Sequence, residues 1–572
     1  MHFSPPVRET PRKYRAKRLK KTHVPAFIGR QRAILARNVR GEDGQDVKLD
    51  EKQPMGTAKT LNIGVSLWFG VRSVSIFATL AGLGFLQVAT TLSKGAEPVV
   101  VIFTQIPFSQ SGSDRSTPTG NQSTQKLTTG SRVCLLDTTN GKVENITHEF
   151  ISAAWPALSP DAKRVLFIGQ RHDADPRALY ERHTETREIR EVPLSLGEIR
   201  RAIYLPRLYT LDDEEPADQI GILARPWSET GDAFFTCRTD GTQVRRITFS
   251  PQGVTAPIVL GDGRLLIGIG ESKSNTVGQR TNPVLYSLHT DGTDLFPFAG
   301  LYDDFAHRSW PCEIDKERVA FLESPPSGGT WLTQVMRARS LRSRREIGQL
   351  AAGEYAWPSS FDDSRMLVSF RSDARSTYAL GLVDLRNGAA ITPYFDDPQY
   401  DDLAAVRLTP RPAPAGRSSS VDERLSTGQL YCFDSRLTDR AEGPRTDGVS
   451  GVRVFRAVAS DASGHKAGPV SEQAMGQATV ETDGSFFLEV PAKTPLRMET
   501  IDADGNVVRA MRTWIWVMPG EERGCIGCHE DRERTPPNRQ VLALRKPPQS
   551  IGVPDEPSES AAPNAAKGAD RP

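Results

Sequence analysis

Residues 233–248 read AFFTCRTDGTQVRRIT, in which two short apolar segments flank the turn Asp240-Gly241. A D-G pair in this setting predicts a β-hairpin, because glycine accepts the positive φ that a tight turn requires. Similar units recur at intervals of about 45 to 55 residues. The other copies begin at Val133, Ala178, Val284, Val335 and Ala379.

A second unit lies between several of these hairpins. It opens with Trp155-Pro156, continues through a turn and ends at Phe167 in an apolar segment that predicts a buried strand. Related stretches begin at Ala256, Trp310 and Trp357. Repeats of this length, each made of short strands, predict the blades of a β-propeller. Six hairpins predict six blades over residues 97–408, or seven if a terminal strand closes the ring. The units resemble the WD40-like repeats of TolB-type propellers.

The chain changes character after the repeats. Residues 409–420 (TPRPAPAGRSSS) are rich in Pro and Ser and predict a linker. Residues 421–534 contain further apolar segments, such as SFFLEV at 485–490, separated by D-G turns, and they predict a small β-sandwich. Residues 535–572 are rich in Pro and Ala and predict a disordered tail. The predicted fold class is therefore all-β, a propeller followed by a sandwich-like domain.

The motif Cys525-Ile-Gly-Cys528-His529 is the stretch of the chain whose residue types and spacing indicate a cofactor site most specifically. Two thiols at this spacing can form thioether bonds to one porphyrin, and the adjacent histidine can bind the iron, which is the c-type haem pattern. The same C-x-x-C spacing serves half of a zinc site or a redox dithiol. Zinc would need further ligands, and the remaining cysteines are Cys134, Cys237, Cys312 and Cys432. We interpret the motif as haem attachment, with zinc as the alternative.

The N-terminal region predicts membrane targeting. Residues 1–72 form a basic arm, expected to be disordered and cytoplasmic, in which Arg8 to Arg40 contains Glu9 as its one acid. Residues 73–92 are 20 residues without a charge, and as a helix they would span about 30 Å. The preceding positive charge predicts that the rest of the chain is exported to the periplasm. A cleaved signal is the alternative to an anchor, especially if Met55 is the true start.

The composition fits a globular protein. The chain has 572 residues, a hydrophobic fraction of 38%, a charged fraction of 25% and a formal net charge of +2, which gives no indication of nucleic-acid binding. Six cysteines in this length exclude a disulfide scaffold. Acidic clusters at residues 212–215, 303–304 and 396–402 are interpreted as solvated loops, with calcium as a further cofactor to consider.

The C-terminal motifs resemble a known family. They are Gly476–Phe486 (GQATVETDGSF), Val490–Pro495 (VPAKTP), Asp502–Gly505 (DADG), Met511–Trp514 (MRTW), Pro519–Glu521 (PGE) and Arg523–Glu530 (RGCIGCHE). This string is similar to the middle domain of the hydrazine synthase alpha subunit, a family that also places a β-propeller before its haem domain. The resemblance implies that Cys525 and Cys528 bind haem c covalently.

The position of the iron ligand departs from the family. In that enzyme a tyrosine four residues beyond the motif histidine binds the iron, and the histidine binds zinc. Glu533 occupies that position here. The covalent geometry favours His529 as the haem-iron ligand, and Glu533, a hard oxygen donor, is the alternative. Met518 and His465 are candidate sixth ligands on residue type alone.

The predicted function combines these observations. The sequence predicts a membrane-anchored, extracytoplasmic c-type haem protein that transfers electrons or performs small-molecule redox chemistry, with a redox protein or a small molecule as its partner. Whether it is an enzyme, such as a haem-dependent oxidoreductase subunit, stays open. The family's enzyme has a second haem domain, which is not expected here, so hydrazine formation is not carried over. The alternative is a non-enzymatic propeller scaffold that binds a protein partner, with a structural or zinc-binding Cys pair.

Overall fold

The computed structural model describes most of the chain beyond residue 98. The described ranges are 99–108, 127–210, 216–229, 231–270, 283–300, 307–325, 328–438, 448–458, 471–527, 535–536 and 538–552. The predicted arm and the apolar segment 73–92 lie outside these ranges. Within them, no helix has the length and apolar character needed to cross a membrane. The only helices there are two short 3-10 turns, η1 (Arg337–Arg339) and η2 (Ala543–Arg545), and the all-β prediction is confirmed.

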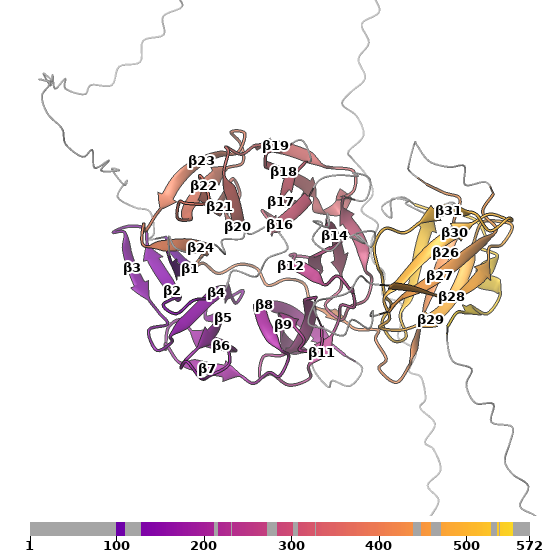
Figure 1. Ribbon diagram of the computed structural model, residues 1–572, viewed down its shortest axis with the longest axis horizontal. Coiled ribbons are helices and arrows are strands. Elements are labelled where there is room, and N and C mark those ends of the chain that lie inside the picture. Colours follow the sequence, from indigo (N-terminus) through magenta and orange to yellow (C-terminus); the bar gives the residue numbers. More distant parts are fainter. Residues whose placement is uncertain are drawn as a thin grey trace, which may run out of the picture. The chain divides into compact units, whose positions relative to one another are not determined.

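Six sheets surround a common centre, and each sheet is one blade (Figure 1). Successive strands within a blade pair antiparallel, as the hairpin repeats predict. The strands of the six blades, in order, are β1 (Val100–Pro107), β2 (Arg132–Asp137), β3 (Lys142–Asn145) and β24 (Tyr400–Arg407); β4 (Ser152–Leu158), β5 (Arg164–Gln170), β6 (Ala178–His183) and β7 (Ile189–Val192); β8 (Glu198–Tyr209), β9 (Ala217–Arg225), β10 (Ala233–Arg238) and β11 (Arg245–Arg246); β12 (Val254–Val259), β13 (Leu265–Ile269), β14 (Val284–Leu288) and β15 (Phe296–Ala299); β16 (His307–Glu313), β17 (Arg318–Ser324), β18 (Trp331–Met336) and β19 (Arg345–Gln349); and β20 (Glu354–Asp362), β21 (Arg365–Arg371), β22 (Ala379–Asp384) and β23 (Ala390–Phe395).

The ring closes through strand exchange between its two ends. β24, the last propeller strand, pairs antiparallel with β1 and becomes the inner strand of the first blade. This terminal strand therefore completes a blade that already exists. The six-bladed prediction is confirmed, and the described residues form no seventh sheet in the ring.

The Trp-Pro units form bulges on the inner strands. The pairing of β4 with β5 shifts between Ala154 and Ala157, and the same shift occurs around Trp310 in β16 and Trp357 in β20. Each tryptophan sits in the left-handed region, with φ of 63° for Trp155, 53° for Trp310 and 55° for Trp357. A β-bulge changes the direction in which a side chain points. The three tryptophan side chains are part of one buried hydrophobic cluster of the propeller.

The segment 409–420 lies against the propeller. Arg411 donates its backbone N–H to the Pro160 carbonyl oxygen at 2.8 Å, and Ala415 donates to the Gly261 carbonyl oxygen at 3.2 Å. The short strand β25 (Arg417–Ser418) then pairs parallel with β8. Most residues of the segment nevertheless remain exposed. That it is a hinge at which the chain can be cleaved stays a prediction.

The C-terminal domain consists of two four-stranded sheets that share one core. One sheet has the order β32-β26-β29-β33 and the other β28-β27-β30-β31. Their strands are β26 (Thr427–Asp434), β27 (Gly451–Val458), β28 (Ser471–Thr479), β29 (Phe486–Pro491), β30 (Leu496–Ile501), β31 (Val507–Ala510), β32 (Glu522–Gly527) and β33 (Gln549–Ser550). Leu488 and Val490 of one sheet and Val452 and Val454 of the other are buried together, as expected for a sandwich.

Part of the predicted disordered tail is instead ordered. Residues 538–552 contain η2 and β33, and β33 pairs parallel with β29. Ala543 and Ile551 are buried, and Leu542 donates its backbone N–H to Asp483 at 2.9 Å. The prediction was wrong for this stretch because a few apolar residues and one carboxylate anchor a sequence whose average composition is typical of disorder.

Candidate functional site

Cys525 is the predicted attachment residue that the structure describes. It lies on β32, which runs parallel to β26, and it stands directly opposite Cys432. Cys525 is partly buried and Cys432 is buried. Cys528, His529 and Glu533 lie outside the described residues, as does His465.

Cys525 and Cys432 line a cavity of about 170 Å³. Phe486 and Ile515 of the C-terminal domain contribute to its walls, and so do Val284 and Tyr286 on β14 of the fourth blade. The walls are mainly apolar, although Arg509, Arg512 and Arg523 also line the cavity. The thiol of the motif is therefore associated with an apolar space that both domains form.

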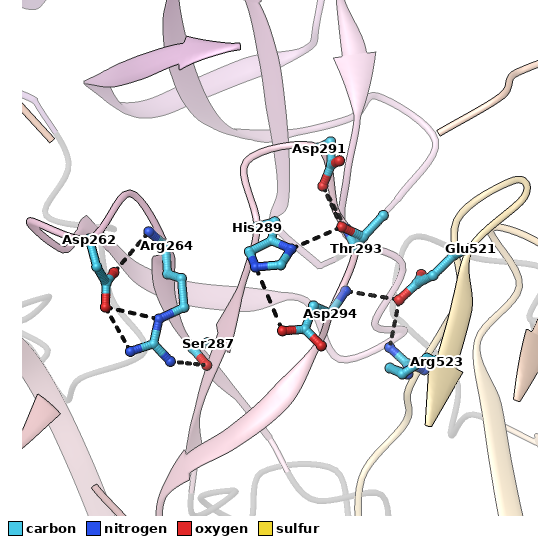
Figure 2. Close-up of polar contacts among 9 residues, drawn as sticks. All are labelled: Asp262, Arg264, Ser287, His289, Asp291, Thr293, Asp294, Glu521 and Arg523. Atoms are coloured by element: carbon cyan, nitrogen blue, oxygen red, sulfur yellow. Dashed lines mark hydrogen bonds and ion pairs between the residues drawn. The ribbon is translucent and has the colours of Figure 1, made fainter. Parts of the chain in front are cut away.

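A buried carboxylate holds the two domains together beside this cavity. Glu521 accepts hydrogen bonds from the backbone N–H of Asp294 at 2.8 Å and of Met518 at 2.7 Å. Figure 2 shows the backbone N–H of Asp294, a residue that follows β14, directed at Glu521, and Arg523 Nη1 lies 3.7 Å from the same carboxylate oxygen. The Tyr286 hydroxyl adds a hydrogen bond to Thr513. The fourth blade is thus attached to the C-terminal domain by both polar and apolar contacts.

His289 lies near this junction and contacts Thr293 and Asp294. Its Nδ1 lies 3.1 Å from Thr293 Oγ1, and its Nε2 lies 3.6 Å from Asp294 Oδ2 (Figure 2). Burial, together with the positive charge of Arg417, lowers the pKa of His289 below its usual range. The imidazole is therefore neutral near pH 7. It orders the turn that presents Asp294 to Glu521, so its role here is structural.

The other candidate ligands do not join this site. Met518 is buried, but it is not among the residues that line the Cys525 cavity. In the acidic cluster at 396–402, burial raises the pKa of Asp402 to about 8, and Gln105 and the Asp397 N–H each donate a hydrogen bond to it at 2.9 Å. The other two acidic clusters fall outside the described ranges. The described residues contain no group of three His, Cys, Asp or Glu that could hold a metal ion.

The contacts that build the junction were missed from the sequence. Asp294 and Glu521 are 227 residues apart, and so are Tyr286 and Thr513. Glu521 lies four residues before Cys525, and its position inside the motif string was the one available signal. No local pattern indicates which blade it contacts.

Comparison with known proteins identifies the C-terminal domain. Residues 446–530 match the family model of the hydrazine synthase alpha subunit middle domain. Subunit alpha of hydrazine synthase from Kuenenia stuttgartiensis is 21% identical over 538 residues, a match that covers 75% of this chain and 65% of that relative. The solved structure of Kuenenia stuttgartiensis hydrazine synthase superimposes with a TM-score of 0.65 at 19% identity, covering 79% of this chain and 72% of the other.

The fold and the comparisons together show what class of protein this chain is and which family it resembles. The fold defines a six-bladed propeller protein with a two-sheet C-terminal domain. Residues 446–530 match the middle-domain family of the hydrazine synthase alpha subunit, as the motifs predicted, and the chain is similar in sequence to that subunit and in fold to a solved hydrazine synthase. It spans just under two thirds of the length of the curated relative, at 65%.

The described residues fit the chemistry of an attached porphyrin. Cys525 supplies a thiol at an apolar surface, and arginines near it can pair with propionate groups. The cavity of about 170 Å³ is smaller than the roughly 300–1,000 Å³ of most ligand pockets. A porphyrin would therefore fill it with only part of the ring.

Proposed function

We propose that this protein is a c-type haem protein of the hydrazine synthase alpha family that transfers electrons or performs redox chemistry on a small molecule. The observation that carries the proposal is the C-x-x-C-H motif inside the matched domain, with Cys525 at an apolar cavity. A bound haem would supply one-electron redox chemistry and a site for a small ligand at iron.

The chain's own residues have distinct roles in this proposal. Cys525 and Cys528 hold the ring, and His529 binds the iron, with Glu533 as the alternative. Phe486, Ile515 and the β14 side chains would exclude water around the attachment site at Cys525, which would influence the reduction potential of a haem bound there. The relative is named as a subunit, so the proposal includes a protein partner.

An absorption spectrum tests the proposal. The full chain, expressed with a cytochrome c maturation system, should show a Soret band that survives acid–acetone extraction, because thioether bonds resist this treatment. Colourless protein under these conditions would contradict the proposal.

The iron ligand is tested by two substitutions. His529→Ala should change the spin state of the ferric protein, because it removes the imidazole beside the attachment site. Glu533→Ala should leave the spectrum unchanged. The assignment is wrong if the two variants show the reverse pattern.

Export is part of the proposal and has its own test. Basic residues before the uncharged segment 73–92 favour a cytoplasmic N-terminus and a periplasmic location for everything that follows. A reporter that is active only in the periplasm should be active when it is fused after Pro572. Activity of a cytoplasmic reporter at the same position would contradict both the topology and the extracytoplasmic attachment of haem.

A further inference from the structure

The propeller has a central cavity that the haem proposal does not use. The inner strands β4, β8, β12, β16, β20 and β24 surround it (Figure 1), and the segment 409–414 lines it as well. Its volume is about 930 Å³, which lies within the range of small-molecule sites. We refer to it below as the central cavity.

Three tryptophans form an aromatic wall in the central cavity. The rings of Trp155 and Trp357 stack with centroids 4.5 Å apart and planes 14° apart, and Trp310 lies 4.3 Å from Trp357 at 45°. All three have the left-handed backbone of the inner-strand bulges, which is strained for a residue other than glycine. Strained conformations of this kind cluster at binding sites more often than elsewhere.

Two of these tryptophans retain an unused donor. The indole Nε1 atoms of Trp310 and Trp357 are buried, and neither has a hydrogen-bond acceptor in the part of the chain that the structure describes. The two residues are only 5% and 6% exposed. A buried N–H without an acceptor is unfavourable, and an acceptor atom within the central cavity would relieve this cost.

Arg201 on β8 adds an uncompensated positive charge. Its guanidinium lies 5.4 Å from the centroid of the Trp357 ring. Burial lowers the pKa of Arg201 to about 10, so the group remains a cation at neutral pH. Within the described residues, no carboxylate forms an ion pair with it, and its titratable neighbour is Cys312, whose pKa burial raises to about 12. The cavity therefore presents a cation without a counter-ion.

Four acids line the central cavity, namely Glu313, Asp315, Glu317 and Asp363, and the first two have partners of their own. Glu313 accepts a hydrogen bond from Arg337 Nη1 at 2.6 Å and another from the Gly261 N–H at 2.8 Å. Asp315 binds Arg318 at 2.7 Å. None of the four acids forms an ion pair with Arg201 within the described residues, so a ligand that enters the cavity can balance its charge.

We propose that the central cavity binds a small planar carboxylate. The guanidinium of Arg201 matches the geometry of a carboxylate and can bind both of its oxygens. The tryptophan wall offers stacking for a flat apolar body. The unused indole N–H groups supply further donors for a polar substituent. Lys316, Arg337, Arg407 and Arg411 also line the cavity, but Arg201 is the guanidinium that lies beside the tryptophan wall. This combination of a guanidinium, aromatic faces and neutral donors distinguishes the site from a general anion-binding surface.

Calorimetric titration of the full chain with benzoate tests this proposal. Benzoate should bind with saturation, and benzamide, which has nearly the same shape without the charge, should bind at least about 10-fold more weakly. Arg201→Gln should weaken benzoate binding by about 10- to 100-fold, the usual effect of losing a charge-assisted hydrogen bond. Trp310→Phe should weaken it by a smaller factor, because it removes one donor and keeps an aromatic ring.

Matched controls separate binding from folding. Trp331→Phe and Arg386→Gln change the same residue types outside the central cavity and should leave the affinity unchanged. Arg201→Gln should not lower the thermal unfolding midpoint, because it removes a partly buried cation that has no acidic partner. If that variant does not fold, Arg201→Lys should retain the charge and bind benzoate with reduced affinity. Equal affinity of wild type and Arg201 variants, or no saturable binding at millimolar benzoate, would overturn the proposal.

Discussion

Replacing both Cys525 and Cys528 by alanine is expected to abolish covalently bound haem. The two thiols are the only groups of the motif that can form thioether bonds, so no covalent link to the ring can form without them. The purified double variant should lose its colour in acid–acetone, whereas the wild-type protein should keep it. Haem staining after denaturing electrophoresis measures the same loss on the intact chain.

Single variants and a distant cysteine provide the controls. Cys525→Ala and Cys528→Ala should each retain one thioether bond and should show a shifted α-band in the reduced spectrum. Cys237→Ala changes a buried cysteine of the third blade, which is not among the residues that line the Cys525 cavity, and should leave the spectrum unchanged. Colour that resists extraction in the double variant would contradict the assignment of both residues.

Replacing Glu521 by alanine is expected to lower the free energy of unfolding by about 3–5 kcal/mol. The substitution leaves the Asp294 and Met518 N–H groups without their acceptor, and it removes the carboxylate beside Arg523. Glu521 and Arg523 are each only 4% exposed, so water cannot readily replace these contacts. Chemical denaturation monitored by tryptophan fluorescence measures the change.

The neighbouring residue supplies a matched control for Glu521. Glu522, the first residue of β32, is exposed, and Glu522→Ala should change the free energy of unfolding by no more than about 0.5 kcal/mol. Glu521→Gln should give an intermediate loss, because an amide oxygen can still accept one of the two N–H bonds. Limited proteolysis should show faster cleavage within 409–420 in the alanine variant. A loss below about 1 kcal/mol in Glu521→Ala would mean that the junction does not depend on this carboxylate.

The propeller could be predicted because its signal is local and repeated. The Asp240-Gly241 turn and its relatives specify hairpins, and their period specifies blades. The Trp-Pro units were recognised as repeats, but their conformation was not. A left-handed tryptophan is unfavourable by intrinsic preference, and only the closing of the ring shows that three such residues meet.

The junction between the domains could not be predicted for a different reason. Glu521 and Asp294 carry no pattern that links them, because their contact depends on which blade faces the C-terminal domain. Residues 538–552 were misjudged because their order comes from tertiary contacts at Leu542 and Ile551. The motif at Cys525 was recognisable at once, since covalent attachment constrains spacing in the sequence itself.

The pairing of β24 with β1 has a consequence for biosynthesis. β1 lacks its inner neighbour until the ribosome has passed Arg407, about three hundred residues later. Closure of so long a loop is slow, and an unpaired strand edge is a template for association with other chains. A nascent chain therefore carries an open first blade through most of its synthesis, and a product truncated before Tyr400 would keep that edge permanently.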